Sequence, residues 1–104
     1  MDAIMIYVTA TSKGEAEMIG RTLVTERLAA CANIIDGMRS IYHWQGAVEQ
    51  ADEVVVLIKT RRSLFDVVQA RVRVLHSAVT PCIVALPLVA ADPDYLAWIA
   101  AETA

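Results

Sequence analysis

Apolar residues along the chain change their spacing several times, and each change marks a predicted element. Three stretches have the β-branched, alternating or continuous apolar pattern of strands, namely Ile4–Ala10, much of Leu28–Thr60 and Pro81–Val89. The middle stretch predicts a long β-hairpin that turns at Gln45-Gly46, since Gly suits the positive φ of a tight turn. Asp36-Gly37 interrupts its first strand and indicates a bulge or bend. Pro87 within the last strand favours an edge position, because Pro donates no ladder hydrogen bond.

Apolar residues at helical spacing fill the remaining segments. Ser12 and Glu15 form a capping box at the start of a first helix, and Gly20 within that helix indicates close packing against the sheet. A second helix is predicted over 63–76, where five apolar residues lie on one stripe. Asp92-Pro93 begins a short final helix, with Asp as the N-cap and Pro at the first helical position.

The order of elements is βαββαβ followed by a helix, which predicts an α+β fold of the ferredoxin-like type. We expect a single domain over 1–104, with an antiparallel sheet of order 4-1-3-2 and both main helices on one face. Val54–Ile58 is apolar without interruption, a pattern typical of a strand covered on both faces. Since the helices would cover only one face, we expect a second subunit to cover the other.

Composition and charge limit the classes of function that the chain could have. Apolar residues make up 57% of the chain, yet no stretch approaches the roughly 20 apolar residues of a membrane span, which favours an oligomer. The formal net charge is −3 and there is no basic run, so a nucleic-acid partner is not expected. The N-terminus lacks the pattern of a signal peptide. Together with only two cysteines, this favours a reducing, cytoplasmic location.

Cys31 and Cys82 fall near the starts of strands on opposite edges of the predicted sheet. Three strand spacings separate them by roughly 14 Å. A disulfide requires Cα atoms within about 7 Å, so an intrachain bridge is excluded. Each cysteine is either a small buried hydrophobe or a soft metal ligand or reactive thiol at a subunit boundary.

Other candidate residues have alternative interpretations. His76 ends the second helix and is either a cation favoured by the helix dipole or a metal ligand or acid–base group. Tyr42 and Trp44 share a face near the hairpin tip and are more typical of an interface anchor than of a cofactor site. Lys59 is either a solvated strand end or an anion-binding charge beside His76. The chain has two histidines and offers no paired nucleophile and base, so we do not expect an enzyme or a three-histidine metal site within one subunit.

The hairpin sequence resembles one known family. The pattern AAC-x-N-I-I-x-G followed by S-I-Y-x-W-x-G, over Ala29–Gly46, is similar to that of CutA proteins, and further segments match in order to the C-terminal helix. The resemblance implies a ferredoxin-like subunit in a tight homotrimer, shaped like the PII signalling proteins, with ligands in clefts between subunits. It also implies a link to tolerance of copper and other divalent metals, without an organic cofactor or a reaction.

The segment after the second helix departs from the family pattern. His76 and Pro81 are retained, whereas Ser77 and Ala78 stand where Pro and Tyr are usual and Cys82 replaces an acidic residue. His76 and Cys82 are therefore the predicted metal ligands, and the thiol would favour Cu(I) or Zn. Tyr42, Trp44 and Lys59 are the predicted ligand cleft, drawn from neighbouring chains. The alternatives are a PII-like module that binds a small anion near Lys59 and the neighbouring arginines, and a purely structural trimeric scaffold.

Overall fold

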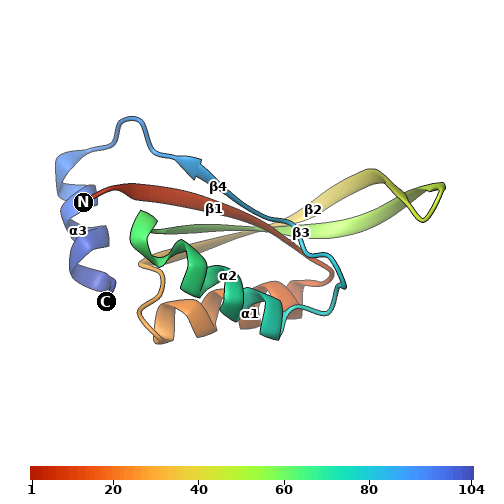
Figure 1. Cartoon of the computed structure of the whole chain (residues 1–104), viewed down its shortest axis with the longest axis horizontal. Coiled ribbons are helices and arrows are strands. Elements are labelled where there is room, and N and C mark those ends of the chain that lie inside the picture. Colours follow the sequence, from red (N-terminus) through yellow and green to blue (C-terminus); the bar gives the residue numbers. More distant parts are fainter.

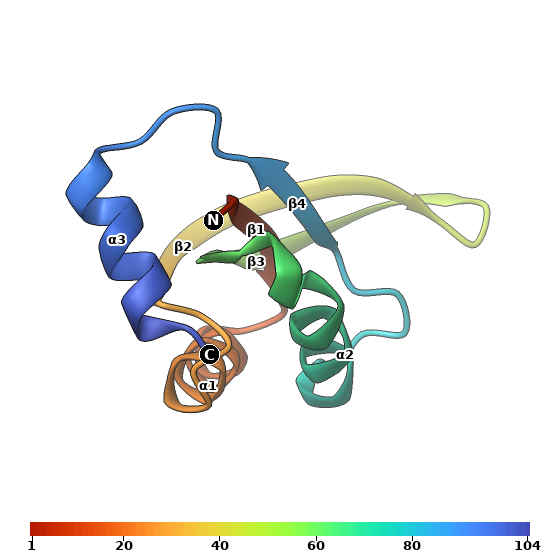
Figure 2. The same ribbon diagram turned by 60° about the vertical axis from the view of Figure 1, so that its left-hand side comes forward.

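The computed structural model describes all 104 residues, and Figure 1 shows one twisted sheet with helices against it. Two helices lie side by side on one face of the sheet, and a third crosses one end of the opposite face (Figure 2). The elements in chain order are β1 (Ala3–Ala10), α1 (Lys13–Thr25), β2 (Cys31–Trp44), β3 (Ala47–Arg61), a 3₁₀ turn (Arg62–Leu64), α2 (Phe65–Leu75), β4 (Ile83–Pro87) and α3 (Pro93–Glu102). No helix is both long enough and apolar enough to cross a membrane.

The antiparallel sheet has the strand order β2-β3-β1-β4, which confirms the predicted ferredoxin-like topology. β4, which contains Pro87, is an edge strand as its sequence predicts. β1 ends at Ala10, opposite Val54, whereas the β2–β3 hairpin continues to its turn. The outer part of the hairpin is therefore paired only with itself. It projects from the body of a molecule measuring 45 × 25 × 23 Å (Figure 1).

Local sequence determines the shape of this hairpin. Gln45 and Gly46 both have positive φ, 50° and 84°, which matches the two central residues of a type I′ turn. Gly37 has a φ of 85° and lies within a register shift between Ile35 and Met38, so the predicted bulge is confirmed. Asp36 and Gly37 of β2 lie opposite Val54 alone, so the bulge adds one residue to the β2 side.

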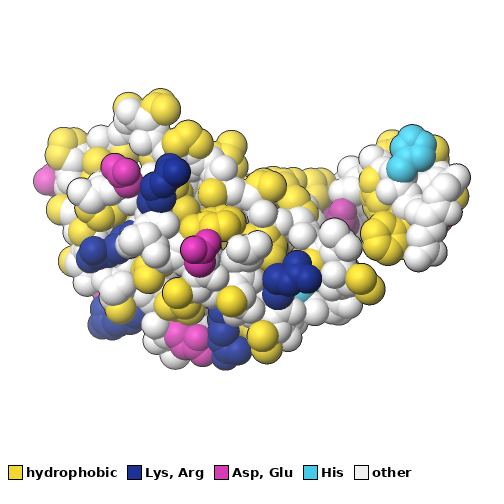
Figure 3. Space-filling model, in the orientation of Figure 1, with side chains coloured by type: hydrophobic (Ala, Val, Ile, Leu, Met, Phe, Trp, Pro, Cys, Tyr) yellow, Lys and Arg dark blue, Asp and Glu magenta, His cyan; other side chains and the backbone are white.

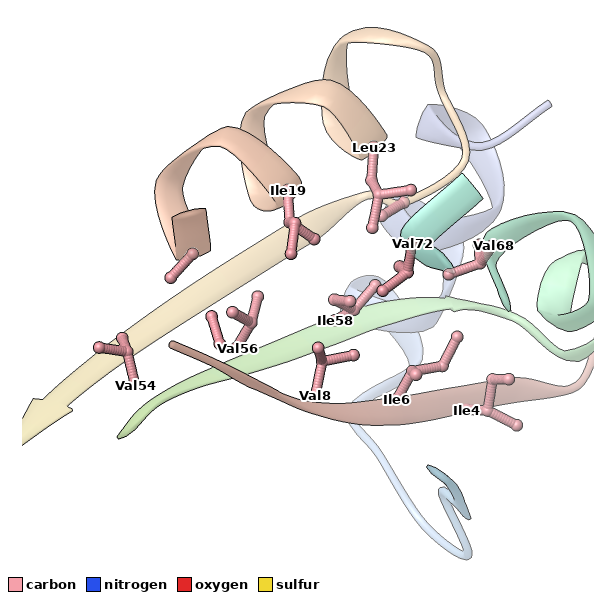
Figure 4. Close-up of a cluster of buried hydrophobic side chains, with 13 residues drawn as sticks. Ile4, Ile6, Val8, Ile19, Leu23, Val54, Val56, Ile58, Val68 and Val72 are labelled. Atoms are coloured by element: carbon pink, nitrogen blue, oxygen red, sulfur yellow. The ribbon is translucent and has the colours of Figure 1, made fainter. Parts of the chain in front are cut away.

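The main core lies between the sheet and the helix pair. Alternate residues of β1 and β3 point toward α1 and α2, as the sequence pattern predicts. Figure 4 shows these side chains together with those of α1 and α2 that meet them. All are at most 4% exposed: Ile4, Ile6, Val8, Ile19, Leu23, Val54, Val56, Ile58, Val68 and Val72. Gly20 of α1 packs against Ala32 of β2, which confirms the close helix–sheet approach expected at this position.

We expected the chain's own helices to leave the other face of the sheet uncovered. In the structure, α3 covers one end of that face. Ile99 is fully buried against Ala3 and Ala30. The Arg61 guanidinium donates to the Ala100 carbonyl at 2.6 Å and to the Thr103 hydroxyl at 2.8 Å, so β3 also holds the C-terminal end of α3. The far end of this face, beyond α3, continues into the projecting hairpin.

Two predicted boundaries are wrong. The second helix begins at Phe65 rather than Ser63, because Arg62–Leu64 form a 3₁₀ turn and no side chain caps α2. β4 covers only Ile83–Pro87, since its pairing with β1 runs from Val8 to Ile4. Cys82 therefore lies just before the strand, in the connection from α2.

Two glycines of α1 allow a matched test of the packing. A Cβ on Gly20 would lie 3.0 Å from the Ala32 Cβ, whereas a Cβ on Gly14 would meet nothing within 4 Å. We expect Gly20→Val to lower the free energy of unfolding by about 1–3 kcal/mol through overpacking. Gly14→Ala should raise it by about 0.5 kcal/mol through helix propensity. Urea unfolding at one fixed protein concentration measures both, and an unchanged Gly20→Val would contradict the described packing.

Candidate functional site

The open face of the sheet contains a cavity at the root of the projecting hairpin, here called the hairpin-root cavity. Its volume is about 840 Å³, within the range of small-molecule sites. Its walls come from β1, the hairpin and the connection before β4. Its lining includes Tyr7, Thr9, Tyr42, Trp44, Glu53, Thr80 and Cys82. Figure 3 shows the narrowing between the body and the hairpin tip.

The register of the hairpin places Tyr42 and Trp44 on one face. Tyr42 pairs with Glu49 and Trp44 with Ala47, two residues apart on each strand. Both aromatic side chains line the hairpin-root cavity and remain 43% and 42% exposed. The structure therefore brings together the two predicted aromatic residues, on the face of the sheet that α1 and α2 do not cover.

Cys82 lines the same cavity. Burial raises the pKa of its thiol, the negative charge of Glu53 raises it further, and a contact from the Thr9 hydroxyl opposes both effects. Cys82 is thus a neutral thiol at neutral pH. It is free, as is Cys31 on the opposite edge strand β2, which agrees with the exclusion of an intrachain disulfide.

The side chain of His76 is only 2% exposed, and both of its ring nitrogens form hydrogen bonds. The Ala78 N–H donates to Nδ1 at 3.0 Å, so this nitrogen is the acceptor, and Nε2–H therefore donates to the Thr9 carbonyl at 2.7 Å. A metal ion could bind either nitrogen only after one of these bonds broke. Through these two hydrogen bonds His76 links the start of the 77–82 connection to the end of β1.

The end of β1, the start of α1 and the end of α2 meet at a junction beside His76. Glu15 lies at this junction, and the sequence pattern did not reveal its full role there. Its carboxylate accepts from the Thr11 N–H at 2.7 Å, the Thr11 hydroxyl at 2.8 Å and the Ser77 N–H at 2.7 Å. It also lies 4.0 Å from His76 Nε2. Burial alone would raise the pKa of Glu15, but the hydrogen bonds from Thr11 and Ser77 outweigh it and lower the pKa to about 2. The capping-box pattern identified Glu15 as a cap but gave no sign of its contact with Ser77.

Within one chain Lys59 does not lie beside His76. It pairs with Met5 of β1, whereas His76 bonds to Thr9 four residues along that strand, roughly 13 Å away. The Lys59 ammonium donates to the Asn33 side chain at 2.9 Å and lies 5.5 Å from the centre of the Tyr95 ring. Within one chain it is therefore remote from the hairpin-root cavity.

Cys31 lies with Lys59 and Asn33, away from the hairpin-root cavity. It pairs with Lys59 across β2 and β3, and its thiol donates to the same Asn33 oxygen at 3.6 Å. The neighbouring cation, Arg61, is committed to α3, and Arg62 lines a separate cavity of about 810 Å³ together with Asp2 and Asp66. No group of three or more His, Cys, Asp or Glu residues lies close enough within the chain to hold a metal ion.

The low pKa of Glu15 makes stability at this junction depend on acid pH. The folded-state pKa lies below the ordinary value of 4.5, so the stabilisation is complete above that pH and is lost as the pH falls toward 2. After allowance for solvent screening it amounts to about 1–3 kcal/mol. We expect Glu15→Gln to remove this contribution, so that its stability changes less than that of wild type between these pH values.

Urea unfolding at a series of pH values measures the difference. Glu17→Gln is the matched control, because Glu17 lies exposed on the same helix and accepts no side-chain hydrogen bond. A wild-type profile identical to that of Glu15→Gln would contradict the role given to this carboxylate.

Comparison with known proteins agrees with the fold and the hairpin motif. A family model described as CutA1 divalent ion tolerance protein matches residues 4–102. The divalent-cation tolerance protein CutA of Thermus thermophilus is 41% identical over 99 residues, which cover 95% of this chain and 96% of that protein. The CutA1 structure from Oryza sativa, at 35% identity, gives a TM-score of 0.97 and covers 100% of this chain and 95% of that chain.

CutA from Archaeoglobus fulgidus, described as a periplasmic divalent cation tolerance protein, gives a TM-score of 0.94 at 39% identity, with coverage of 96% of this chain and 97% of that chain. Matches of this extent include β1, the complete hairpin, both main helices and α3. The chain therefore belongs to the CutA family of divalent ion tolerance proteins.

Proposed function

We propose that this CutA chain forms a homotrimer that binds copper or another divalent metal ion weakly at the hairpin-root cavity, with Cys82 as the soft ligand. One observation carries the proposal. Cys82 and Glu53 line the same cavity, whose lining contains no Lys or Arg. A thiol becomes a strong metal ligand when it loses its proton. In this cavity the bound metal ion itself would promote that loss, since no Lys or Arg lines it.

The donors of a single chain support only weak binding. Cys82 and Glu53 supply two ligands, fewer than a closed structural site uses. Water or a neighbouring chain would complete the coordination. His76 contributes in this proposal mainly by positioning the 77–82 connection, and it becomes a ligand only if its bond to Thr9 or Ala78 opens.

Unpaired edges of the sheet support the homotrimer. Ile35 on β2 is 52% exposed, and Val84 and Leu86 on β4 are 50% and 45% exposed. These apolar side chains lie on the two edge strands, whose free backbone groups require a partner or protection. Two different edges that meet head to tail make a heterologous contact, which can close into a ring. The projecting Tyr42 and Trp44 would then contact a neighbouring chain, and Lys59 of one chain could approach the cavity of another.

A binding role in the cytoplasm fits the remaining features. The two free thiols, Cys31 and Cys82, are typical of a reducing compartment. The family is named for ion tolerance rather than for a reaction, which favours a binding protein over an enzyme. The hairpin-root cavity gives no support to the anionic-ligand alternative, because Asp52 and Glu53 line it and no Lys or Arg does.

Titration with Cu(I) and Zn²⁺ under reducing conditions tests the metal site. We expect Cys82→Ser to weaken the affinity by at least about tenfold, since it removes a direct ligand. Cys31→Ser is the matched control and should bind as wild type does, because this thiol lies on the opposite edge of the sheet. Competition with a chelator of known affinity provides the measurement.

His76→Ala distinguishes a ligand from a positioning residue. If His76 positions the connection, the variant should lose stability and bind metal less tightly, and the lost affinity should be smaller than in Cys82→Ser. Equal affinity in wild type, His76→Ala and Cys82→Ser would reject the metal site proposed here.

A further inference from the structure

Two partly buried charges of the chain have no counter-charge. Six Asp, Glu, Lys or Arg residues are neither fully buried nor fully exposed. Four of them form an ion pair or at least two hydrogen bonds, namely Glu15, Arg61, Arg71 and Glu102. The other two have opposite charges. Glu53 takes part in none of the chain's ion pairs, and Lys59 reaches only the neutral Asn33 oxygen, at 2.9 Å, and the Tyr95 ring.

These two side chains lie on the same face of the sheet but cannot meet within one chain. Glu53 and Lys59 are six positions apart on β3, so both point to the same side. That side is the open face, because Val54, Val56 and Ile58 between them point into the core under the helices. Six strand residues span roughly 20 Å. The two side chains cannot bridge this distance, so any ion pair between them joins two chains.

The surface between the two charges is apolar and accessible. Ile35 lies beside Val55 on this face, and Val84 and Leu86 of β4 reach it from the other edge. A neighbouring chain that covers these side chains also removes Glu53 and Lys59 further from water. A charge removed from water without an opposite charge is costly. In an assembly of identical chains, each of these two residues is the partly buried counter-charge that the other lacks.

We propose that Lys59 of one chain forms an ion pair with Glu53 of the next chain, at the hairpin-root cavity. Each chain supplies one ammonium group and one carboxylate, so a closed head-to-tail ring pairs all of them. The pair fixes the register of the contact, because a shifted contact would leave both charges covered and unpaired. The inference rests on the proposed homotrimer and adds the interaction that aligns its chains.

The ion pair and the proposed metal ion share the Glu53 carboxylate. A metal ion that binds Cys82 and Glu53 displaces Lys59 of the neighbouring chain, which lowers its affinity. The pair itself requires no metal ion and no thiol. Cys82→Ser should therefore lose metal binding and remain a trimer, so failure of the metal site leaves the ion pair intact.

Reversal of the two charges, singly and together, tests the pair by sedimentation equilibrium of the full chain. Glu53→Lys brings two ammonium groups together at every contact, and Lys59→Glu brings two carboxylates together. We expect each single variant to raise the concentration at which the trimer dissociates by at least about 100-fold, since like charges repel. The double variant restores opposite charges and should dissociate within about tenfold of wild type. Lys13→Glu with Glu17→Lys makes the same changes at exposed positions of α1 and should have no effect.

A carbodiimide cross-linker applied to wild type provides a measurement that does not depend on the folding of a variant. It joins an ammonium group to a carboxylate only when the two are in contact. We expect an amide between Lys59 and Glu53. Trypsin would then release two copies of the 40–61 peptide joined together, which proves that the link lies between chains. Glu53→Gln should remove this product, and Glu17→Gln should not.

The outcomes separate the ion pair from the homotrimer. The ion pair is overturned if the wild-type trimer gives no Lys59–Glu53 cross-link, if a single variant dissociates as wild type does, or if the double variant dissociates as readily as the single variants. A wild-type chain that sediments as a monomer would reject the homotrimer and the ion pair together.

Discussion

The β2–β3 hairpin is longer than the strand it pairs with, and this mismatch is the constraint on which the rest of the structure depends. β1 stops at Ala10, opposite Val54, while β2 and β3 continue to the turn at Gln45 and Gly46. Beyond Val54 the hairpin has no third strand and no helix behind it. Its aromatic residues therefore remain partly exposed, and the step where β1 ends becomes the floor of a cavity.

The junction at the end of β1 builds the opposite wall of that cavity. The Thr9 carbonyl accepts from His76, and Glu15 accepts from the backbone of Ser77. These bonds join β1, α1 and the end of α2, and they fix the start of the connection that carries Thr80 and Cys82. His76 and Glu15 therefore act through the position of other residues, while Cys82 and Glu53 line the cavity itself.

Short-range rules were sufficient to predict much of the fold. The turn at Gly46, the bulge at Gly37 and the cap at Ser12 each follow from one or two neighbouring residues, and the order of elements then limits the topology. Long-range contacts were not predictable in the same way. Glu15 meets Ser77 across 62 positions of sequence, and the four-residue offset between Lys59 and His76 depends on the register with β1.

The account requires that other copies of the chain cover what one chain leaves exposed. Both edge strands and the hairpin present apolar side chains, and a monomer would keep Ile35, Val84 and Trp44 in water. Sedimentation equilibrium at micromolar concentration tests this requirement most directly. The account predicts a single species of three times the chain mass of 11.3 kDa. A stable species of one chain mass under the same conditions would contradict it.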